Sequence, residues 1–144
     1  MSEYGAFINP ERGKQLILFD QVSSGGIQAT DVDALIEYHN RGYIIFEVKC
    51  VGAPMPTGQR LALERLVTDA CRAGKKAIAI VAEHTVYDTS KPVIIKDCTV
   101  RELFLGSEQH WRKPKCPMTA GELTDAFIRL IDSGSARPKM LRSH

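Results

Sequence analysis

The stretch VDALIEYHNRGYIIFEVKC, residues 32–50, decides the fold. It holds two runs of β-favouring residues, 32–38 and 43–50, separated by the polar connection HNRG. A polar connection of this length that ends in glycine is typical of a β-hairpin. The stretch therefore predicts two antiparallel strands joined as a hairpin.

Glu47, Val48 and Lys49 form the one place in the sequence where an acidic residue is followed two positions later by lysine. Because alternate side chains of a strand point to the same face, Glu47 and Lys49 share a face of a strand predicted to be buried. Charges in such a position need a partner, a metal ion or a solvent cleft. Asp33 lies on the preceding strand and is expected opposite this pair.

Two carboxylates and one lysine in one small region can hydrolyse a phosphodiester. Hard carboxylate oxygens hold Mg²⁺ or Mn²⁺, and the ion orients the phosphate and lowers the pKa of bound water. Lys49 can then position the attacking water or stabilise negative charge in the transition state. These residues therefore predict a metal-dependent phosphodiesterase site.

Downstream of the hairpin, residues 51–56 contain two prolines and are predicted to leave the sheet as a loop. Thr57 is expected to cap a helix that ends at Gly74. Its predicted buried face consists of Leu63, Leu66, Val67, Ala70 and Cys71. The short apolar run 77–81 then predicts a strand covered on both faces.

Four further segments complete the predicted fold. Residues 14–19, 92–95 and 98–105 are expected to be strands, the last with alternation at Val100, Glu102 and Phe104. Thr119 and Glu122 have the spacing of a capping box before a closing helix that ends at Gly134. The sequence thus predicts an α/β domain over residues 1–134, with a mixed sheet of five or six strands flanked by helices, and a basic tail over 135–144.

Gln59 is the next candidate for the site. It lies four residues before Leu63, on the helix face predicted to pack on the sheet, and a buried glutamine needs hydrogen-bonding partners. One interpretation that needs no site is a helix-end glutamine whose amide bonds loop backbone.

Asp33, the apolar hairpin, Glu47-Val48-Lys49 and the following helix resemble the PD-(D/E)XK nuclease superfamily. The resemblance covers about residues 30–84 and is strongest to compact phage-type or Holliday-junction-resolvase-like members. It implies a restriction-endonuclease-like fold, Mg²⁺ or Mn²⁺ held by Asp33, Glu47 and the Val48 backbone carbonyl, and Lys49 as the catalytic lysine. It also implies that Gln59 lies near the metal-bound water.

The sequence departs from the family pattern at several points. Val32 precedes Asp33 where many members have proline, and Leu63 does not match the tyrosine that neighbours the family's glutamine. Asp31 is a second candidate carboxylate beside Asp33, and Glu11 is a candidate for the glutamate that the family often supplies from its first helix.

Two residues outside this segment have open interpretations. His84 could approach the cleft, but a side chain that accepts a backbone hydrogen bond is the favoured interpretation. Arg101 could contact phosphate or form a structural ion pair.

The composition restricts the remaining possibilities. A net charge of +2 is too small to identify a nucleic-acid binder by itself. Basic residues gather toward the carboxyl end, where they predict either phosphate contacts or a solvated face; they are Arg112, Lys113, Lys115, Arg137, Lys139 and Arg142. The four cysteines form no C-x-x-C pair, no signal peptide is recognised, and no apolar run approaches the ~20 residues of a membrane span.

Together these features predict a cytoplasmic Mg²⁺- or Mn²⁺-dependent deoxyribonuclease that acts in DNA recombination, repair or phage DNA processing, as a monomer or a homodimer and without a membrane partner. One alternative is an inactive nuclease-fold module that binds nucleic acid or a protein. Another is an unrelated α/β domain in which Glu47 and Lys49 form a structural ion pair.

Overall fold

The computed structural model describes residues 11, 14–18, 20 and 22–134. The chain divides into two units, Met1–Asp31 and Val32–His144, and each is described by itself. The single domain expected over residues 1–134 stays a prediction.

Residues 14–18 of the first unit form a turn and irregular chain, so the strand predicted there is wrong for these residues. Leu16, Ile17 and Leu18 are 88%, 84% and 81% exposed. Their apolar composition favours a strand, but a strand also needs backbone partners, which composition does not supply. Phe19, the last residue of the predicted strand, lies outside the described residues.

The second unit contains a five-stranded mixed sheet in the order β1-β2-β3-β4-β5. β2 and β3 are parallel, and the other neighbouring pairs are antiparallel. The strands are β1 (Ala34–Tyr38), β2 (Gly42–Cys50), β3 (Lys76–His84), β4 (Thr99–Leu105) and β5 (Trp111–Arg112). The α/β class and the antiparallel hairpin β1–β2 are therefore confirmed.

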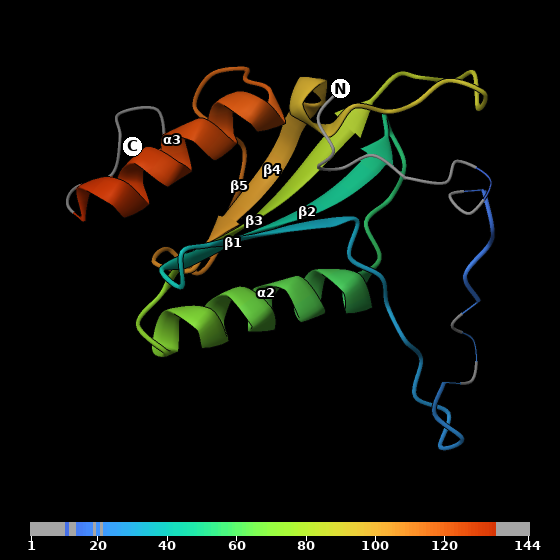
Figure 1. Ribbon diagram of the computed structural model, residues 1–144, viewed down its shortest axis with the longest axis horizontal. Coiled ribbons are helices and arrows are strands. Elements are labelled where there is room, and N and C mark those ends of the chain that lie inside the picture. The colour runs from blue at the N-terminus through green and yellow to red at the C-terminus, as the bar shows by residue number, and fades with distance from the viewer. Residues whose placement is uncertain (1–10, 12–13, 19, 21, 135–144) are drawn as a thin grey trace. The chain divides into compact units, whose positions relative to one another are not determined.

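Two helices cover opposite faces of this sheet, α2 (Thr57–Arg72) on one side and α3 (Ala120–Ser133) on the other (Figure 1). Gln59, Leu63 and Val67 are the buried residues of α2, one turn apart, so a single stripe of the helix faces the sheet. Leu66, predicted to lie on the buried face, is 51% exposed, so the prediction is wrong for this residue. The cap predicted at Thr57 is wrong, because the N-cap is Pro56, which forms no side-chain cap hydrogen bond.

The capping box that begins α3 is confirmed. The Glu122 backbone N–H donates to Thr119 Oγ1 at 3.1 Å, and the Glu122 side chain accepts from the Thr119 backbone. The helix ends at Gly134, which has the left-handed φ of 60°.

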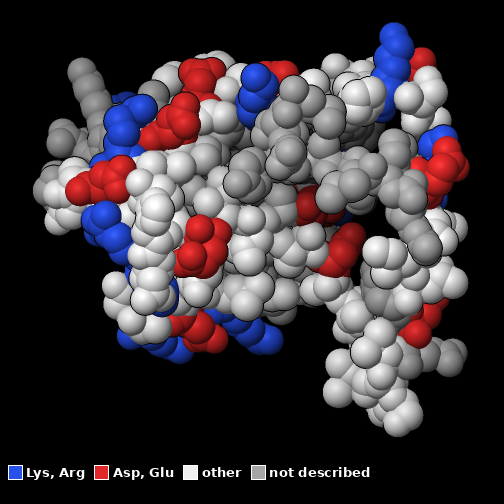
Figure 2. Space-filling model, in the orientation of Figure 1, with Lys and Arg blue, Asp and Glu red and all other residues white. Residues whose placement is uncertain are grey.

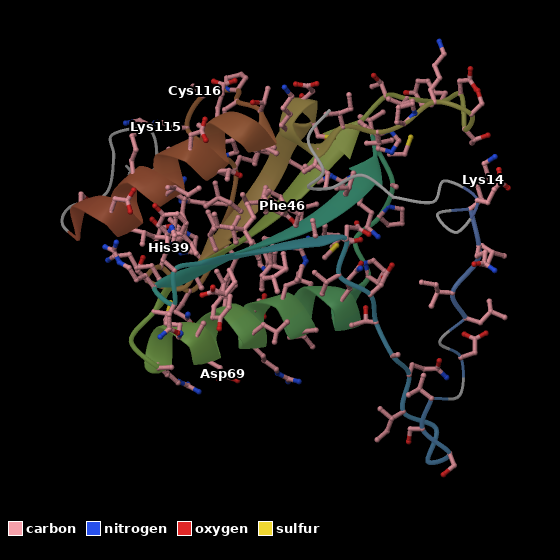
Figure 3. All side chains as sticks on the ribbon, viewed as in Figure 1. Lys14, His39, Phe46, Asp69, Lys115 and Cys116 are labelled. Carbon is pink, nitrogen blue, oxygen red and sulfur yellow. The ribbon has the colours of Figure 1, made fainter. Side chains whose placement is uncertain are left out.

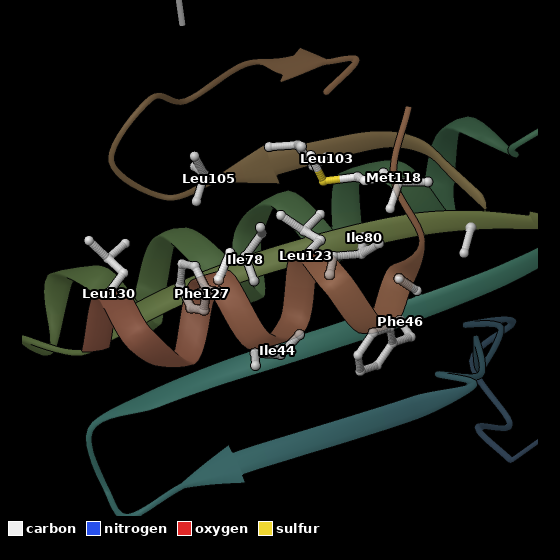
Figure 4. Close-up of a cluster of buried hydrophobic side chains, with 14 of the residues drawn as sticks. Ile44, Phe46, Ile78, Ile80, Leu103, Leu105, Met118, Leu123, Phe127 and Leu130 are labelled. Atoms are coloured by element: carbon white, nitrogen blue, oxygen red, sulfur yellow. The ribbon is translucent and has the colours of Figure 1, made fainter. Parts of the chain in front are cut away.

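The main core lies between α3 and the sheet. Phe127 and Leu123 of the helix pack with Ile44, Ile78 and Ile80 of the two central strands, as Figure 4 shows. These side chains are no more than 1% exposed. Burial of this kind is the main favourable contribution to folding, and here it joins the last helix to the centre of the sheet.

Two predictions in the third quarter of the chain need correction. Residues 92–95 form irregular chain that leads into the 3₁₀ helix η1 (Ile95–Asp97), not a strand. In β4 the register shifts between Val81 and Ala82 of β3, so Arg101 is an extra residue on β4. Val100 therefore packs in the α3-side core and Phe104 in the α2-side core, instead of sharing one face as predicted.

Gly42 at the start of β2 allows a close approach of α3 and β3, and this leads to a stability prediction. A Cβ there would lie 2.6 Å from Ile131 Cδ1 and 2.8 Å from the Lys76 carbonyl oxygen. We expect Gly42→Ala to lower the free energy of unfolding by about 1–3 kcal/mol, as overpacking does. Chemical denaturation measures this, with Gly58→Ala as the control, because a Cβ at Gly58 meets nothing within 4 Å. Equal stability of Gly42→Ala and the unmodified protein would contradict the close approach.

Candidate functional site

Strand β2 presents different chemistry on its two faces. Ile44 and Phe46 pack in the core on the α3 side, whereas Tyr43 and Ile45 pack with α2. By the same alternation, Glu47 points to the α2 side. Lys49 Nζ lies 3.0 Å from Glu47 Oε1, which shows that both charged side chains share this face.

Asp33 lies immediately before β1 and opposite Glu47. The β1–β2 ladder pairs Ala34 with Phe46, so the next position in the same register brings Asp33 to Glu47. The Val48 backbone N–H donates to Asp33 Oδ2 at 2.7 Å, which fixes the carboxylate against the strand. The negative charge of Asp33 is close enough to Glu47 to raise the pKa of that carboxyl.

Glu47 is the most deeply placed charge of the site. Its side chain is 4% exposed, whereas the side chain of its partner Lys49 is 20% exposed, so the ammonium lies nearer the solvent. One carboxylate oxygen, Oε1, meets Lys49, and the other, Oε2, is buried without a hydrogen-bond partner. A buried carboxylate oxygen that lacks a partner is costly and indicates a position for a ligand.

Gln59 reaches the same group from α2. It is 9% exposed, and its side chain lies close enough to Glu47 to lower the pKa of the carboxyl. Its Oε1 is a second buried oxygen without a partner. Of the two positions expected from the sequence, the structure therefore places Gln59 near the carboxylates.

Burial raises the pKa of Glu47 above its usual range, and the charge of Asp33 adds to this effect. Contacts with Lys49 and Gln59 oppose the shift without cancelling it. Burial dominates because a charge in a low-dielectric site loses its hydration. A bound cation would therefore stabilise the site, because it would interact favourably with the ionised Glu47 carboxylate.

The donors present fit a magnesium or manganese ion. Mg²⁺ is commonly held by one or two carboxylates, with water and substrate phosphate oxygens as the other ligands. Asp33 and Glu47 supply two carboxylates, and the bare Glu47 Oε2 supplies an oxygen that no protein group satisfies. No group of three or more His, Cys, Asp or Glu side chains is placed for a metal within the described residues, so further ligands would be waters or substrate.

Ion pairs surround this cluster on the same side of the sheet. Arg101 Nε lies 2.8 Å from Glu83 Oε2, which makes the ion-pair interpretation of Arg101 correct. Arg60 of α2 pairs with Glu102 and lies over the ring of Trp111, with Cζ 4.7 Å from the ring centroid. Arg60, which adjoins Gln59, was not predicted as part of this region, because helical spacing alone does not reveal a partner on β4.

The favoured interpretation of His84 is also confirmed. Its Nδ1 accepts a hydrogen bond from the Val86 backbone N–H at 3.1 Å. The imidazole therefore helps to turn the chain after β3.

A separate apolar groove of about 490 Å³ lies between the β1 edge and α2. Its lining includes Leu35, Tyr43 and Leu66, and it does not include Asp33, Glu47 or Lys49. This groove has no charged group other than Lys75, so it is distinct from the carboxylate site.

The basic residues expected to contact DNA have different surroundings. Arg112 Nε pairs with Glu108 Oε1 at 2.7 Å in a largely buried position, and burial lowers the pKa of Arg112. Lys113 and Lys115 are exposed, and Figure 3 shows Lys115 on the α3 side of the sheet, away from the Glu47 face. Acidic and basic side chains are interspersed over the visible face of the described residues (Figure 2).

Several predicted residues are not tested by this geometry. Arg137, Lys139 and Arg142 lie outside the described residues. Glu11 and Asp31 belong to the Met1–Asp31 unit, where Glu11 Oε1 lies 3.3 Å from Lys14 Nζ. Their contributions to a site stay predictions.

Comparison of the chain with protein-family models, curated proteins and solved structures found no match. Within the described residues, no helix has the length and apolar character needed to cross a membrane.

The raised pKa of Glu47 leads to a prediction about stability and pH. Ionised Glu47 opposes folding in the metal-free protein, so the stability linked to its protonated form is lost as the pH rises through the raised pKa. We expect Glu47→Gln to be more stable than the unmodified protein at pH 7, with the difference shrinking below the usual pKa range of glutamate. In this variant Lys49 loses its charged partner, but its ammonium is partly exposed and can be hydrated by solvent.

Thermal unfolding across this pH range, in the presence of a chelator, measures the difference. Asp125→Asn is the control, because Asp125 is an exposed carboxylate of α3. A Glu47→Gln protein that is less stable at pH 7 would show that the Lys49 pair outweighs the burial of the charge.

Proposed function

We propose that this chain is a divalent-metal-dependent deoxyribonuclease that hydrolyses DNA phosphodiester bonds at Asp33, Glu47, Lys49 and Gln59. The observation that carries the proposal is the Glu47 carboxylate, which is buried beside Asp33 with Oε2 unsatisfied. A carboxylate in a purely structural ion pair is expected to have both oxygens satisfied or hydrated.

Each side chain has a role that follows from its place. Asp33 and Glu47, with the Val48 carbonyl, would hold Mg²⁺ or Mn²⁺, which polarises the phosphate and activates a water molecule. The Val48 N–H fixes the Asp33 carboxylate, and the helix fixes Gln59. Gln59 can orient the attacking water through its free Oε1.

Lys49 supplies positive charge to the phosphate. Its ammonium is partly exposed and anchored on one side by Glu47, so its other donors can meet a phosphate oxygen that approaches from solvent. Negative charge that develops on the phosphate is then stabilised without rearrangement of the protein.

The order of elements supports a restriction-endonuclease-like arrangement. β1, β2, α2 and β3 follow one another in the chain, and α2 connects the two parallel central strands. The carboxylates come from the β1–β2 hairpin and the glutamine from α2, which agrees with the PD-(D/E)XK resemblance of residues 30–84. We propose membership of that superfamily on this basis, with DNA recombination, repair or phage DNA processing as the setting.

The function is tested by incubating the protein with linear, circular and four-way-junction DNA, with Mg²⁺, with Mn²⁺ or with a chelator. Metal-dependent cleavage of at least one substrate is expected. DNA binding without cleavage at any metal concentration would favour an inactive nuclease-fold module instead, and neither binding nor cleavage would leave a structural ion pair as the role of Glu47.

We predict that Glu47→Gln and Asp33→Asn each lower cleavage by more than about a hundredfold, because the loss of a metal ligand exceeds the 10–100-fold cost of losing an outer-shell partner. Asparagine can still accept the Val48 hydrogen bond, so the hairpin should persist. The measurement is single-turnover cleavage at saturating metal. Glu37→Gln is the matched control, since Glu37 is an exposed carboxylate of the same hairpin.

We predict that Lys49→Met lowers single-turnover cleavage by about two orders of magnitude, the scale of one electrostatic contact in the transition state. Methionine keeps much of the aliphatic stem and removes the charge. Metal affinity, measured by calorimetry on the same preparation, should persist or rise because a nearby positive charge has gone. Lost metal binding with unchanged chemistry at saturating metal would overturn the role given to Lys49.

A further inference from the structure

A second carboxylate lies within reach of Lys49. In the parallel register of β2 and β3, Lys49 is directly opposite Glu83. Neighbouring strands are about 4.8 Å apart, and paired residues in a ladder point to the same face. Glu83 is therefore placed to compete with Glu47 for the Lys49 ammonium.

Arg101 forms an ion pair with Glu83, the carboxylate that could compete for Lys49. Its Nε donates to Glu83 Oε2 at 2.8 Å, and its Nη2 donates to the Cys50 carbonyl oxygen at 3.4 Å. The guanidinium thus extends from β4, past the end of β3, to the end of β2. Both partners of the ion pair are largely buried, with side-chain exposures of 19% for Arg101 and 24% for Glu83, so the contact is little screened by water.

The extra residue in β4 allows Arg101 to contact Glu83. Val81 pairs with Glu102 and Ala82 with Val100, so Arg101 is the inserted residue. An inserted residue changes the direction of side chains along its strand, and such irregularities are frequent next to active sites. The inserted residue here carries the one guanidinium that reaches Glu83 among the described contacts.

We propose that Arg101 is a positioning residue, which holds Glu83 in an ion pair so that Lys49 stays with Glu47 and the phosphate. This inference depends on the proposed function, because Lys49 is the residue whose availability it explains. Without the guanidinium, the free Glu83 carboxylate would draw the ammonium toward β3 and away from the reacting phosphate.

Two other roles for Arg101 make different predictions. If Arg101 contacts a DNA phosphate directly, its loss weakens DNA binding and lowers the salt dependence, whatever residue stands at position 83. If the ion pair serves only stability, removing either partner has a similar effect, because each change leaves one buried charge unpaired.

The experiment compares Arg101→Gln, Glu83→Gln and the double variant with the unmodified protein, all in the full chain. We expect Arg101→Gln to cleave about tenfold more slowly in single turnover, the loss expected if Glu83 holds Lys49 in about nine of ten molecules. Glu83→Gln and the double variant should cleave at close to the unmodified rate, since the competing charge is absent. DNA affinity should be similar in all four proteins.

Arg101→Lys is the conservative variant in this series. A lysine retains a positive charge for Glu83, so it should recover most of the rate lost in Arg101→Gln, and it keeps the test valid if the glutamine variant does not fold. A double variant as slow as Arg101→Gln would overturn the proposal, as would Glu83→Gln alone being equally slow.

A readout that needs no cleavage separates this proposal from the proposed function. The side-chain ¹⁵Nζ NMR signal of Lys49 should move in Arg101→Gln and return in the double variant, because its ion-pair partner changes and is then removed. An unmoved signal overturns the positioning role, even if DNA is cleaved. Absence of cleavage by the unmodified protein overturns the nuclease function, even if the signal moves as expected.

Discussion

The burial of one carboxylate, Glu47, is the constraint on which the rest of the site depends. The group lies on β2, an inner strand of the sheet, on the face that α2 covers, and is 3% exposed. Two neighbours limit the cost of this position: Lys49 by its charge and Gln59 by its amide. Asp33 increases the cost, since a second negative charge raises the pKa further. Such an arrangement is poor for stability alone and suits a cation-binding site.

The same strand also supplies the core, and the alternation of β2 keeps the two tasks apart. Ile44 and Phe46 face α3 and are fully packed, so the strand is held rigidly from one side. Glu47 and Lys49 face α2, where the ion pairs of Arg60 with Glu102 and Arg101 with Glu83 continue the polar region across β3 and β4. Functional side chains on a well-packed strand are positioned more accurately than those on a loop.

The sequence predicted the parts of this structure that depend on local pattern. Alternation in residues 43–50 indicated which side chains share a face, and the spacing of Gln59 from Leu63 placed the glutamine on the sheet side of its helix. The capping box at Thr119 was recognised because both of its hydrogen bonds lie within four residues.

Features that depend on distant partners could not be predicted in this way. Residues 14–18 and 92–95 are apolar enough for strands, yet no local signal indicates whether a partner strand exists. The irregularity at Arg101 arises from the pairing of β4 with β3, so the expected alternation of Val100 with Phe104 was wrong. The partner of Arg101 was likewise open, because Glu83 lies on another strand, 18 residues away in the sequence.

The central claim is that Asp33 and Glu47 bind one divalent cation, and paramagnetic NMR with Mn²⁺ tests it most directly. At low Mn²⁺, the backbone amide signals of Glu47, Val48 and Gln59 should broaden first, because broadening falls steeply with distance from the ion. Signals near the exposed carboxylates of α3, such as Asp125, should stay sharp at the same concentration. The Glu47→Gln protein should lose the selective broadening. Uniform broadening, or broadening that begins at α3 and is unchanged in Glu47→Gln, would contradict the claim.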